Sequence, residues 1–392
     1  MKVDYLKNNI KYFEDIILYK GIFYHKTPEN FTIHNRFNIN IQIKNIKLLN
    51  KENVNCAIQY TKPIIFIEGF NHNIGHLIWD CMYPSWYCLF FKNENLWNND
   101  FVWMVKHKMY IEHDGKQRNK WHLDILKKFS GNDITTNKLL LNKFNKPIKI
   151  NLLISGLINL GLGCRMRNLC INKQFKHHNN DPVNIFINRF FLRYNITRNI
   201  HNINNISDII FIHNKRKYNG INELFEKLND EYKNLYNFKY IDLSKHTFEE
   251  ELNIYNKARM VICGVGTARA NSCFMPIGSV EIQTNRHNKT LPNNIGFFDT
   301  HLGTISDNLK VININEYTEH ECDNNLCSNK LECLIKETLK IIPYTKKINV
   351  ENNLPTYINK HKINLNDNQF KSWQKSCSNN ITDIYKYILN KS

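Results

Sequence analysis

Arg259-Met-Val-Ile-Cys-Gly-Val-Gly-Thr-Ala-Arg-Ala-Asn-Ser-Cys-Phe-Met-Pro-Ile-Gly-Ser-Val-Glu-Ile-Gln283 sets the architecture of this chain. Its opening run, Met260–Cys263, is apolar and rich in β-branched residues, a pattern typical of a strand buried on both faces. After a glycine turn, Ala268–Phe274 combines small residues with helix formers and predicts a short helix. A proline and a glycine then end the helix, so Ser279–Gln283 is predicted as the next strand. The order strand, turn, helix, strand predicts an α/β unit.

The turn between the first strand and the helix predicts an anion site. Gly264 and Gly266 let the backbone turn sharply, and Thr267 is a candidate N-cap. The first N–H groups of a helix have no intrahelical partner and the helix dipole is positive there, so such a turn attracts phosphate oxygens. The alternative is that the two glycines serve only the packing of an α/β turn.

Residues Gly266–Glu281 resemble the nucleotide-sugar motif of the family-61 glycosyltransferases. That family includes transferases of protein O-linked glycans and plant xylosyl- and arabinosyltransferases. Its motif is a Gly-Ala/Thr-rich turn, an Asn, a Phe-Leu/Met-Pro-x-Gly corner and a strand Glu. The matching positions are Gly266, Thr267, Asn271, Phe274, Pro276, Gly278 and Glu281. The chain departs from the pattern at Val265, where many members carry His.

A second stretch, Glu68-Gly-Phe-Asn-His-Asn-Ile-Gly-His-Leu-Ile-Trp-Asp-Cys-Met-Tyr-Pro84, resembles the N-terminal motif of the same family. In that motif a His and an Asp, here His76 and Asp80, open a helix after a strand. Residues four apart share a helix face, and inverting sugar transfer needs one base to take the acceptor hydroxyl proton. Both are candidates for that base; the alternative gives them local hydrogen bonds and caps. Asn71 and His72, in the preceding loop, are candidate acceptor contacts.

On the donor side, the resemblance implies that the backbone N–H groups of Gly266, Thr267 and Ala268 bind the diphosphate. Asn271 belongs to the same donor-binding set. Glu281 is expected at the carboxyl end of a strand, where a carboxylate can accept two hydrogen bonds from ribose hydroxyls. The alternative for Glu281 is a surface ion pair with one of the many lysines.

Positive charge at the leaving diphosphate is supplied by Arg or Lys in a site without a metal. Arg269 lies in the first turn of the predicted helix, from which it reaches the phosphates or points to solvent. The family usually places an Arg just after the strand that here ends at His213; Arg216 is the nearest counterpart, and Lys215 is a further candidate. No Asp-x-Asp pair, with which many sugar transferases hold a divalent cation, occurs in the chain. We therefore expect metal-independent transfer with no metal and no cofactor.

The length of 392 residues suits two domains, because strand and helix patterns alternate on both sides of a loop-like region near residues 159–180. We predict an N-terminal acceptor-side domain at 1–180, a nucleotide-sugar domain at 181–345 that opens with a helix at Pro182–Tyr194, and a C-terminal helical extension at 346–392. The resemblance implies an α/β fold of two Rossmann-like domains that face a cleft, the GT-B arrangement, with the extension packing back across.

Charge and cysteine content bear on the function class. The formal net charge is +18, but the lysines are spread along the chain and form no single arm or stripe, which suits any polyanionic ligand, nucleotide diphosphates included; the alternative is compositional bias and solubility. Eleven cysteines without a Cys-x-x-Cys pair favour buried free thiols, as at Cys81, Cys88 and Cys263, over disulfides or zinc. No stretch approaches the roughly 20 apolar residues of a membrane span, so a cytoplasmic protein is expected.

The sequence thus predicts an inverting, metal-independent glycosyltransferase. Its donor would be a nucleotide sugar, expected to be a uridine diphosphate (UDP) sugar, and its acceptor a hydroxyl of a glycan or glycoprotein. The alternative is a non-catalytic basic protein that binds nucleic acid or glycans on a two-domain α/β shell.

Overall fold

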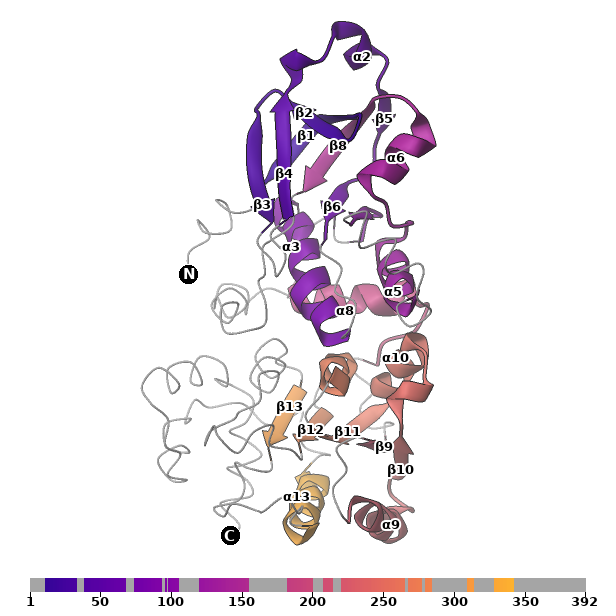
Figure 1. Ribbon diagram of the computed structural model, residues 1–392. Helices are drawn as coiled ribbons and strands as arrows, with labels where there is room; N and C mark the ends of the chain where they lie inside the picture. The colour runs from indigo at the N-terminus through magenta and orange to yellow at the C-terminus, as the bar shows by residue number, and fades with distance from the viewer. Residues whose placement is uncertain are drawn as a thin grey trace, which may run out of the picture. The chain divides into compact units, whose positions relative to one another are not determined.

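The computed structural model describes residues 11–33, 39–67, 74–93, 96, 98–105, 120–154, 182–199, 207–213, 220–264, 267–276, 279–283, 309–313 and 328–341. The chain forms two compact units (Figure 1). The first contains the described residues up to 154 together with residues 182–194, and the second those from 195 onward. Among the described residues, no helix is long and apolar enough to cross a membrane. The predicted extension at 346–392 lies outside the described residues.

The first unit is built on a mixed sheet with the strand order β3-β4-β2-β1-β8-β6-β7, in which β5 also pairs with β8. Its strands are β1 Tyr12–Tyr19, β2 Ile22–His25, β3 Glu29–Ile33, β4 Ile39–Asn45, β5 Ile58–Tyr60, β6 Ile64–Phe66, β7 Val102–Met104 and β8 Ile148–Ile154. Strand β6 is parallel to both of its neighbours, β7 and β8. Strand β1, in contrast, is antiparallel to both β2 and β8. The sheet is therefore parallel around β6, where strands and helices alternate along the chain, and contains antiparallel pairs among the N-terminal strands.

The antiparallel pairing of β1 with β2 follows from the turn that joins them. Only Lys20 and Gly21 separate the paired residues Tyr19 and Ile22. Both turn residues have positive φ, 48° and 80°. Two consecutive residues with positive φ make the tight turn whose twist matches a hairpin, and a two-residue connection can join only antiparallel strands.

The helices of the first unit are α2 Lys51–Asn55, the π-helix η2 His76–Met82, α3 Tyr83–Lys92, α5 Lys120–Ser130, α6 Asn137–Phe144 and α8 Pro182–Arg193, and a 3₁₀ turn η1 covers Ile46–Leu48. Four of these helices, η2, α3, α5 and α8, share an aromatic core. The apolar pattern of residues 74–91 predicts one long helix, and a helix is found there, although His76–Met82 is π-helical. Cys81 and Cys88 are buried free thiols on it, as predicted.

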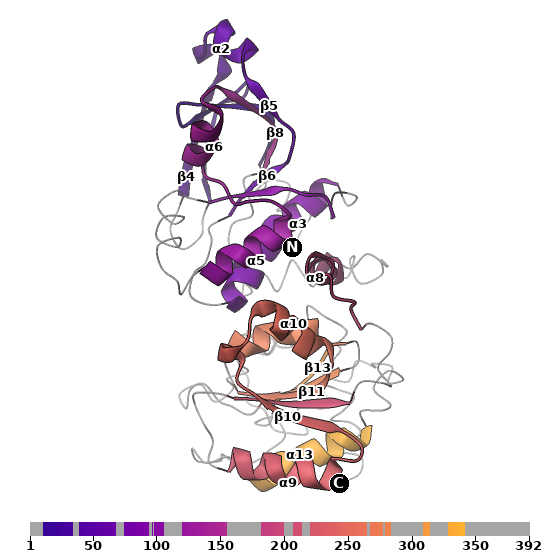
Figure 2. The same ribbon diagram turned by 90° about the vertical axis from the view of Figure 1, so that its right-hand side faces the viewer.

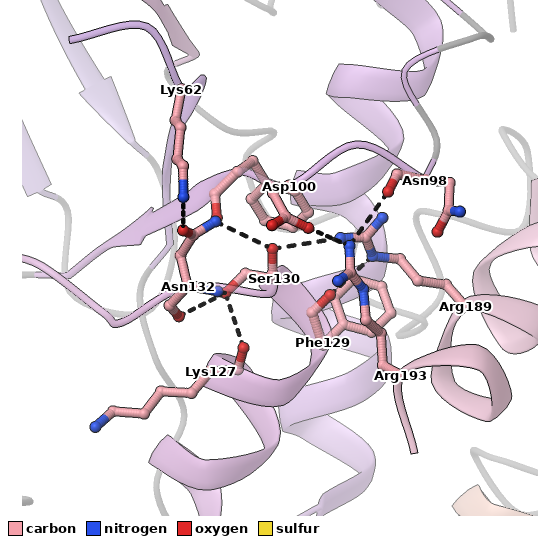
Figure 3. A network of polar contacts seen from close by, with 10 residues as sticks. Lys62, Asn98, Asp100, Lys127, Phe129, Ser130, Asn132, Arg189 and Arg193 are labelled. Atoms are coloured by element: carbon pink, nitrogen blue, oxygen red, sulfur yellow. Dashed lines mark hydrogen bonds and ion pairs between the residues drawn. The ribbon is translucent and has the colours of Figure 1, made fainter. Parts of the chain in front are cut away.

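Helix α8 packs in the first unit, although the sequence pattern assigns it to the second domain. The ring of Phe186 lies 5.8 Å from that of Trp79 and 4.9 Å from that of Phe129, between centroids. Arg189 is fully buried and donates through Nε to the carbonyl of Phe129, 2.8 Å away, and through Nη2 to the carbonyl of Ser130 at 3.4 Å (Figure 3). These carbonyls end α5, so Arg189 caps the last turn of one helix from another.

The second unit contains a parallel sheet with the order β10-β9-β11-β12-β13. The strands are β9 Asp208–Ile212, β10 Asn237–Ile241, β11 Ala258–Cys263, β12 Ser279–Gln283 and β13 Leu309–Asn313. The helices are α9 Ile221–Tyr232, the 3₁₀ turn η7 Leu243–Lys245, α10 Phe248–Asn256, the 3₁₀ helix η8 Thr267–Phe274 and α13 Ser328–Ile341. Helix α10 covers one face of the sheet, and α9 and α13 cover the other (Figure 2). The strands predicted at Met260–Cys263 and Ser279–Gln283 and the helix predicted at Ala268–Phe274 are confirmed, with ends that differ by up to two residues, although the helix is a 3₁₀ helix.

Each sheet contains a place where consecutive parallel strands lie on opposite sides of an earlier strand. In the second unit the chain runs from β9 to β10 on one side and then returns to β11 on the other side of β9. In the first unit β6 likewise has β7 on one side and the later strand β8 on the other. Open α/β sheets bind ligands at such a reversal, beside the carboxyl ends of the two strands that flank it. By this rule, a ligand site is expected at the residues that follow β6 and β8 in the first unit and β9 and β11 in the second.

Candidate functional site

The predicted donor residues follow the two strands that flank the reversal in the second sheet. Strands β9 and β11 are parallel and hydrogen-bonded neighbours, with Phe211 opposite Ile262, so their carboxyl ends lie at the same edge. Lys215 and Arg216 come shortly after the end of β9, and Gly266 shortly after the end of β11. These three residues lie outside the described residues.

The helix that follows β11 is η8, a 3₁₀ helix of eight residues. Its described residues begin at Thr267. The backbone N–H groups of Thr267, Ala268 and Arg269 stand in its first turn, where helical donors have no intrahelical partner. The side chains of Thr267 and Arg269 lie outside the described residues, so the predicted hydroxyl and guanidinium contacts stay predictions.

Helix α10 fixes η8 from one side. The Tyr255 hydroxyl donates to the Ala268 carbonyl at 2.8 Å, and Tyr255 is 0% exposed. The Asn271 amide Nδ2 donates to Glu251 Oε2 at 2.6 Å. Asn271, a predicted contact of the donor nucleotide, is 1% exposed. Its amide group is already hydrogen-bonded to the carboxyl group of Glu251. Its Oδ1 is buried without a hydrogen-bond partner.

Burial dominates the pKa values of the groups around this contact. Burial raises the pKa of Glu251 to about 7, and the hydrogen bond from Asn271 opposes that shift. Burial also holds the pKa of the Tyr255 hydroxyl well above its usual range, with further upward contributions from Cys263, Glu251 and Glu281. Since no charged form is favoured here, the Tyr255 hydroxyl stays a neutral hydrogen-bond donor at physiological pH.

Glu281 lies within the sheet and not at its surface. It is the third of the five residues of β12, with Val261 opposite it on β11 and Val311 on β13. The expected place at the strand's carboxyl end is wrong, because pairing with β13 continues to Gln283. Glu281 is 0% exposed and the Cys263 thiol donates to its Oε1 at 3.7 Å, so a surface ion pair is also wrong.

The predicted catalytic pair lies on the helix that follows β6, the strand beside the reversal in the first sheet. His76 is the first and Asp80 the fifth residue of the π-helix η2, and their side chains lie outside the described residues. The Tyr83 N–H donates to the Ile78 carbonyl, five residues back, which is the π-helical pattern. This wider turn still places residues four and five apart on one face, and π-helical turns are frequent at functional sites. Asn71 and His72 lie outside the described residues.

Two residues of the site are absent from the sequence prediction, Glu251 and Tyr255. Their spacing of four puts them on one face of α10. That face also carries Phe248 and Leu252, which are buried. The signal in the sequence is a carboxylate at a position of the helix where the apolar pattern calls for a core residue.

The described residues contain no group of three or more His, Cys, Asp or Glu side chains placed to hold a metal ion. Metal-independent transfer remains a prediction. A comparison with curated proteins finds no match. The family model described as Glycosyltransferase 61 matches residues 74–282, more than half of the chain, and it spans the helix with His76 and Asp80, strands β9 and β11, and nearly all of β12. The chain is a glycosyltransferase and belongs to the glycosyltransferase 61 family.

Proposed function

We propose that this glycosyltransferase moves a sugar, with inversion and without a metal ion, from a UDP-sugar to a hydroxyl of a glycan or glycoprotein. One observation carries the donor half of the proposal. One segment with predicted phosphate-binding residues follows strand β9, and the other follows strand β11. These two strands flank the strand-order reversal of a parallel sheet. That edge is where open α/β sheets bind nucleotides.

The diphosphate would be bound by the backbone N–H groups of Gly266, Thr267 and Ala268. Backbone N–H groups at the start of a helix can bind an anion although they carry no formal positive charge. Arg269, Arg216 and Lys215 would supply the charge that stabilises the diphosphate as the glycosidic bond breaks, the part that a metal ion plays in other transferases. Membership of a glycosyltransferase family favours this reading of the +18 charge over a non-catalytic nucleic-acid-binding role.

Glu281 would accept hydrogen bonds from the ribose hydroxyls, and Asn271 would contribute to the same side of the donor site. Since Glu281 is fully buried in this structure, contact with a ribose requires neighbouring side chains to move when the nucleotide binds. The role of Glu281 is therefore the part of the donor site that most needs a direct test.

On the acceptor side, His76 or Asp80 would take the proton of the attacking hydroxyl, and Asn71 and His72 would contact the acceptor. Both catalytic candidates follow β6, at the strand-order reversal of the first sheet. We propose the GT-B arrangement, in which the first unit binds the acceptor and the second the nucleotide. The shared order of three parallel strands in the two units, β7-β6-β8 and β10-β9-β11, supports a pair of related α/β lobes.

Calorimetry with UDP in the presence of EDTA, together with hydrolysis of a panel of nucleotide sugars, tests the proposal. The wild-type protein should bind UDP without metal. Asp80→Asn should bind UDP like the wild type and lose turnover about 100-fold or more if Asp80 is the base, and His76→Asn should do so if His76 is. Glu281→Gln should weaken UDP binding roughly tenfold or more, because a charge-assisted contact is lost. Full activity in all three variants, or no UDP binding by the wild type, would overturn the proposal.

A further inference from the structure

Helices α10 and η8 share three side-by-side contacts. Along this row the residue numbers rise on α10 and fall on η8. On α10 the contact residues are spaced by three and four, which is one face of an α-helix. On η8 they are spaced by three, and residues three apart eclipse in a 3₁₀ helix. The contacting pairs are Phe248 with Phe274, Glu251 with Asn271 and Tyr255 with Ala268. This matched spacing fixes both the rotation of η8 about its axis and its position along α10.

The contact nearest the anion-binding turn is the hydrogen bond from Tyr255. Its hydroxyl holds the Ala268 carbonyl at 2.8 Å. In a trans peptide the C=O of one residue and the N–H of the next point in opposite directions. A fixed Ala268 carbonyl therefore points the backbone N–H of Arg269 away from α10. That N–H is a first-turn donor of η8, so Tyr255 orients one of the groups that an anion would meet.

The second polar contact holds Asn271 in either protonation state of Glu251. As a carboxylate, Glu251 accepts from the Asn271 amide N–H at 2.6 Å. As a neutral acid it also has a proton to donate, and the Asn271 Oδ1 is a buried acceptor without a partner. A carboxylic acid and a primary amide can form two hydrogen bonds to each other, which would satisfy that oxygen. The raised pKa of Glu251 agrees with a substantial neutral fraction near pH 7.

The titratable and charged groups around this contact come from several elements. They are Tyr255 on the same helix, Cys273 on η8, Cys263 on β11, Glu281 on β12 and Arg198. Burial holds the pKa of Cys273 well above its usual range, as it does that of Tyr255. Neither group changes charge near neutral pH, so a pH effect in this range that disappears in Glu251→Gln is assigned to Glu251.

We propose that Tyr255 and Glu251 are positioning residues for the donor nucleotide. Neither contacts it; they hold η8 so that the first-turn N–H groups converge on the diphosphate. The inference rests on the proposed function, because it assumes that this turn binds the diphosphate. It assigns part of the donor affinity to a helix that belongs to neither of the two family motifs.

The test uses conservative variants of the full-length chain and UDP as the probe. Tyr255→Phe keeps the ring and removes only the hydroxyl, and we expect the UDP Kd to rise about tenfold, which corresponds to about 1.4 kcal/mol. Tyr236→Phe is the matched control, since Tyr236 also donates to a backbone carbonyl, that of Leu339 at 3.3 Å, on the opposite face of the same sheet. Glu251→Gln keeps a donor and an acceptor for Asn271 and should bind like the wild type, whereas Glu251→Ala should bind more weakly.

Two readouts separate a positioning role from general destabilisation. The acceptor KM should stay unchanged in Tyr255→Phe while the donor KM rises. Amide hydrogen exchange of residues 267–271, measured without nucleotide, should accelerate in Tyr255→Phe and Glu251→Ala and not in Tyr236→Phe or Glu251→Gln.

Equal UDP affinity of the wild type and Tyr255→Phe overturns the inference. If the wild type binds no UDP at all, the proposed function fails, and hydrogen exchange then decides about the helix contact alone: unchanged exchange in both Tyr255→Phe and Glu251→Ala refutes it. Should Glu251→Ala fail to fold, Tyr255→Phe and its control still give the answer.

Discussion

Replacing Arg189 by methionine should destabilise the first unit, because a buried cation there closes the end of a helix. Arg189 is 0% exposed, donates to the carbonyls of Phe129 and Ser130, and lies 5.1 Å from the ring centroids of Phe101 and Phe129. Burial lowers the pKa of Arg189 to about 9, so the side chain is still protonated at pH 7.

The size of the effect follows from what each group loses. The Phe129 carbonyl would be left without this donor, at a cost of about 1–3 kcal/mol. The Ser130 carbonyl loses less, because it keeps the N–H of Phe101 at 3.2 Å. Loss of cation–π contact with two rings adds about 1 kcal/mol, and removal of a buried charge gives back a similar amount. The sum is a loss of about 2 kcal/mol in the free energy of unfolding.

Urea unfolding followed by tryptophan fluorescence measures this loss. Four of the six tryptophans lie in the described part of the first unit, namely Trp79, Trp86, Trp103 and Trp121. Arg193→Met is the matched control. Arg193 is on the same helix and pairs with Asp100 at 2.5 Å, but both side chains are partly exposed, so its loss should cost about 0.5 kcal/mol. An Arg189→Met protein as stable as the Arg193→Met protein would refute the reasoning.

Two further stability predictions test other parts of the structure. The folded-state pKa of Glu251 is raised from 4.5 to about 7, so the folded chain binds more protons than the unfolded chain between these values and this group makes stability fall as pH rises through that window. Glu251→Gln removes the effect, and its melting temperature should exceed that of the wild type at pH 8 and match it at pH 4.5; a constant difference across this range would contradict the assignment. Gly131 ends α5 with φ +74°, and an added Cβ would overlap the Asp100 carboxylate, so Gly131→Ala should cost at least about 1 kcal/mol in urea unfolding, whereas Gly21→Ala, with open space around it, should cost only the strain of positive φ.

The second sheet is the part of the fold that the sequence predicts best. Strand β11 contains the apolar run Met260–Cys263, and α10 carries a capping box in which Thr247 and Glu250 exchange hydrogen bonds. These are local signals, so the elements can be located without knowledge of their neighbours. The pairing of β1 with β8 joins residues more than 100 positions apart and has no local signal.

The assignment of α8 could not be made from order along the chain. The helix comes after the loop-like region that suggests a domain boundary, yet Phe186 and Arg189 complete the core and the helix cap of the first unit. Similarly, the apolar pattern of residues 74–91 predicts a helix but does not distinguish hydrogen bonds to the fourth residue back from those to the fifth.

In the candidate site, too, the sequence locates single elements but not the contacts between them. The two family motifs locate the turns that follow strands β6 and β11, because the glycines and prolines of turns can be recognised in the sequence. Glu251 lies in an acidic run, Glu249–Glu251, of the kind that normally faces solvent at a helix start. Its place on the face with Phe248 and Leu252 is visible in the sequence, but its hydrogen bond to Asn271 on η8 is known only from the structure.

Backbone nitrogens after β11 are proposed to bind the diphosphate of a nucleotide sugar. A crystal structure of the full-length chain soaked with UDP in the presence of EDTA tests this proposal most directly. We expect phosphate oxygens about 3 Å from the backbone nitrogens of Thr267 and Ala268, at the carboxyl edge shared by β9 and β11. UDP bound elsewhere on the chain, with those nitrogens turned into the protein interior, would contradict it.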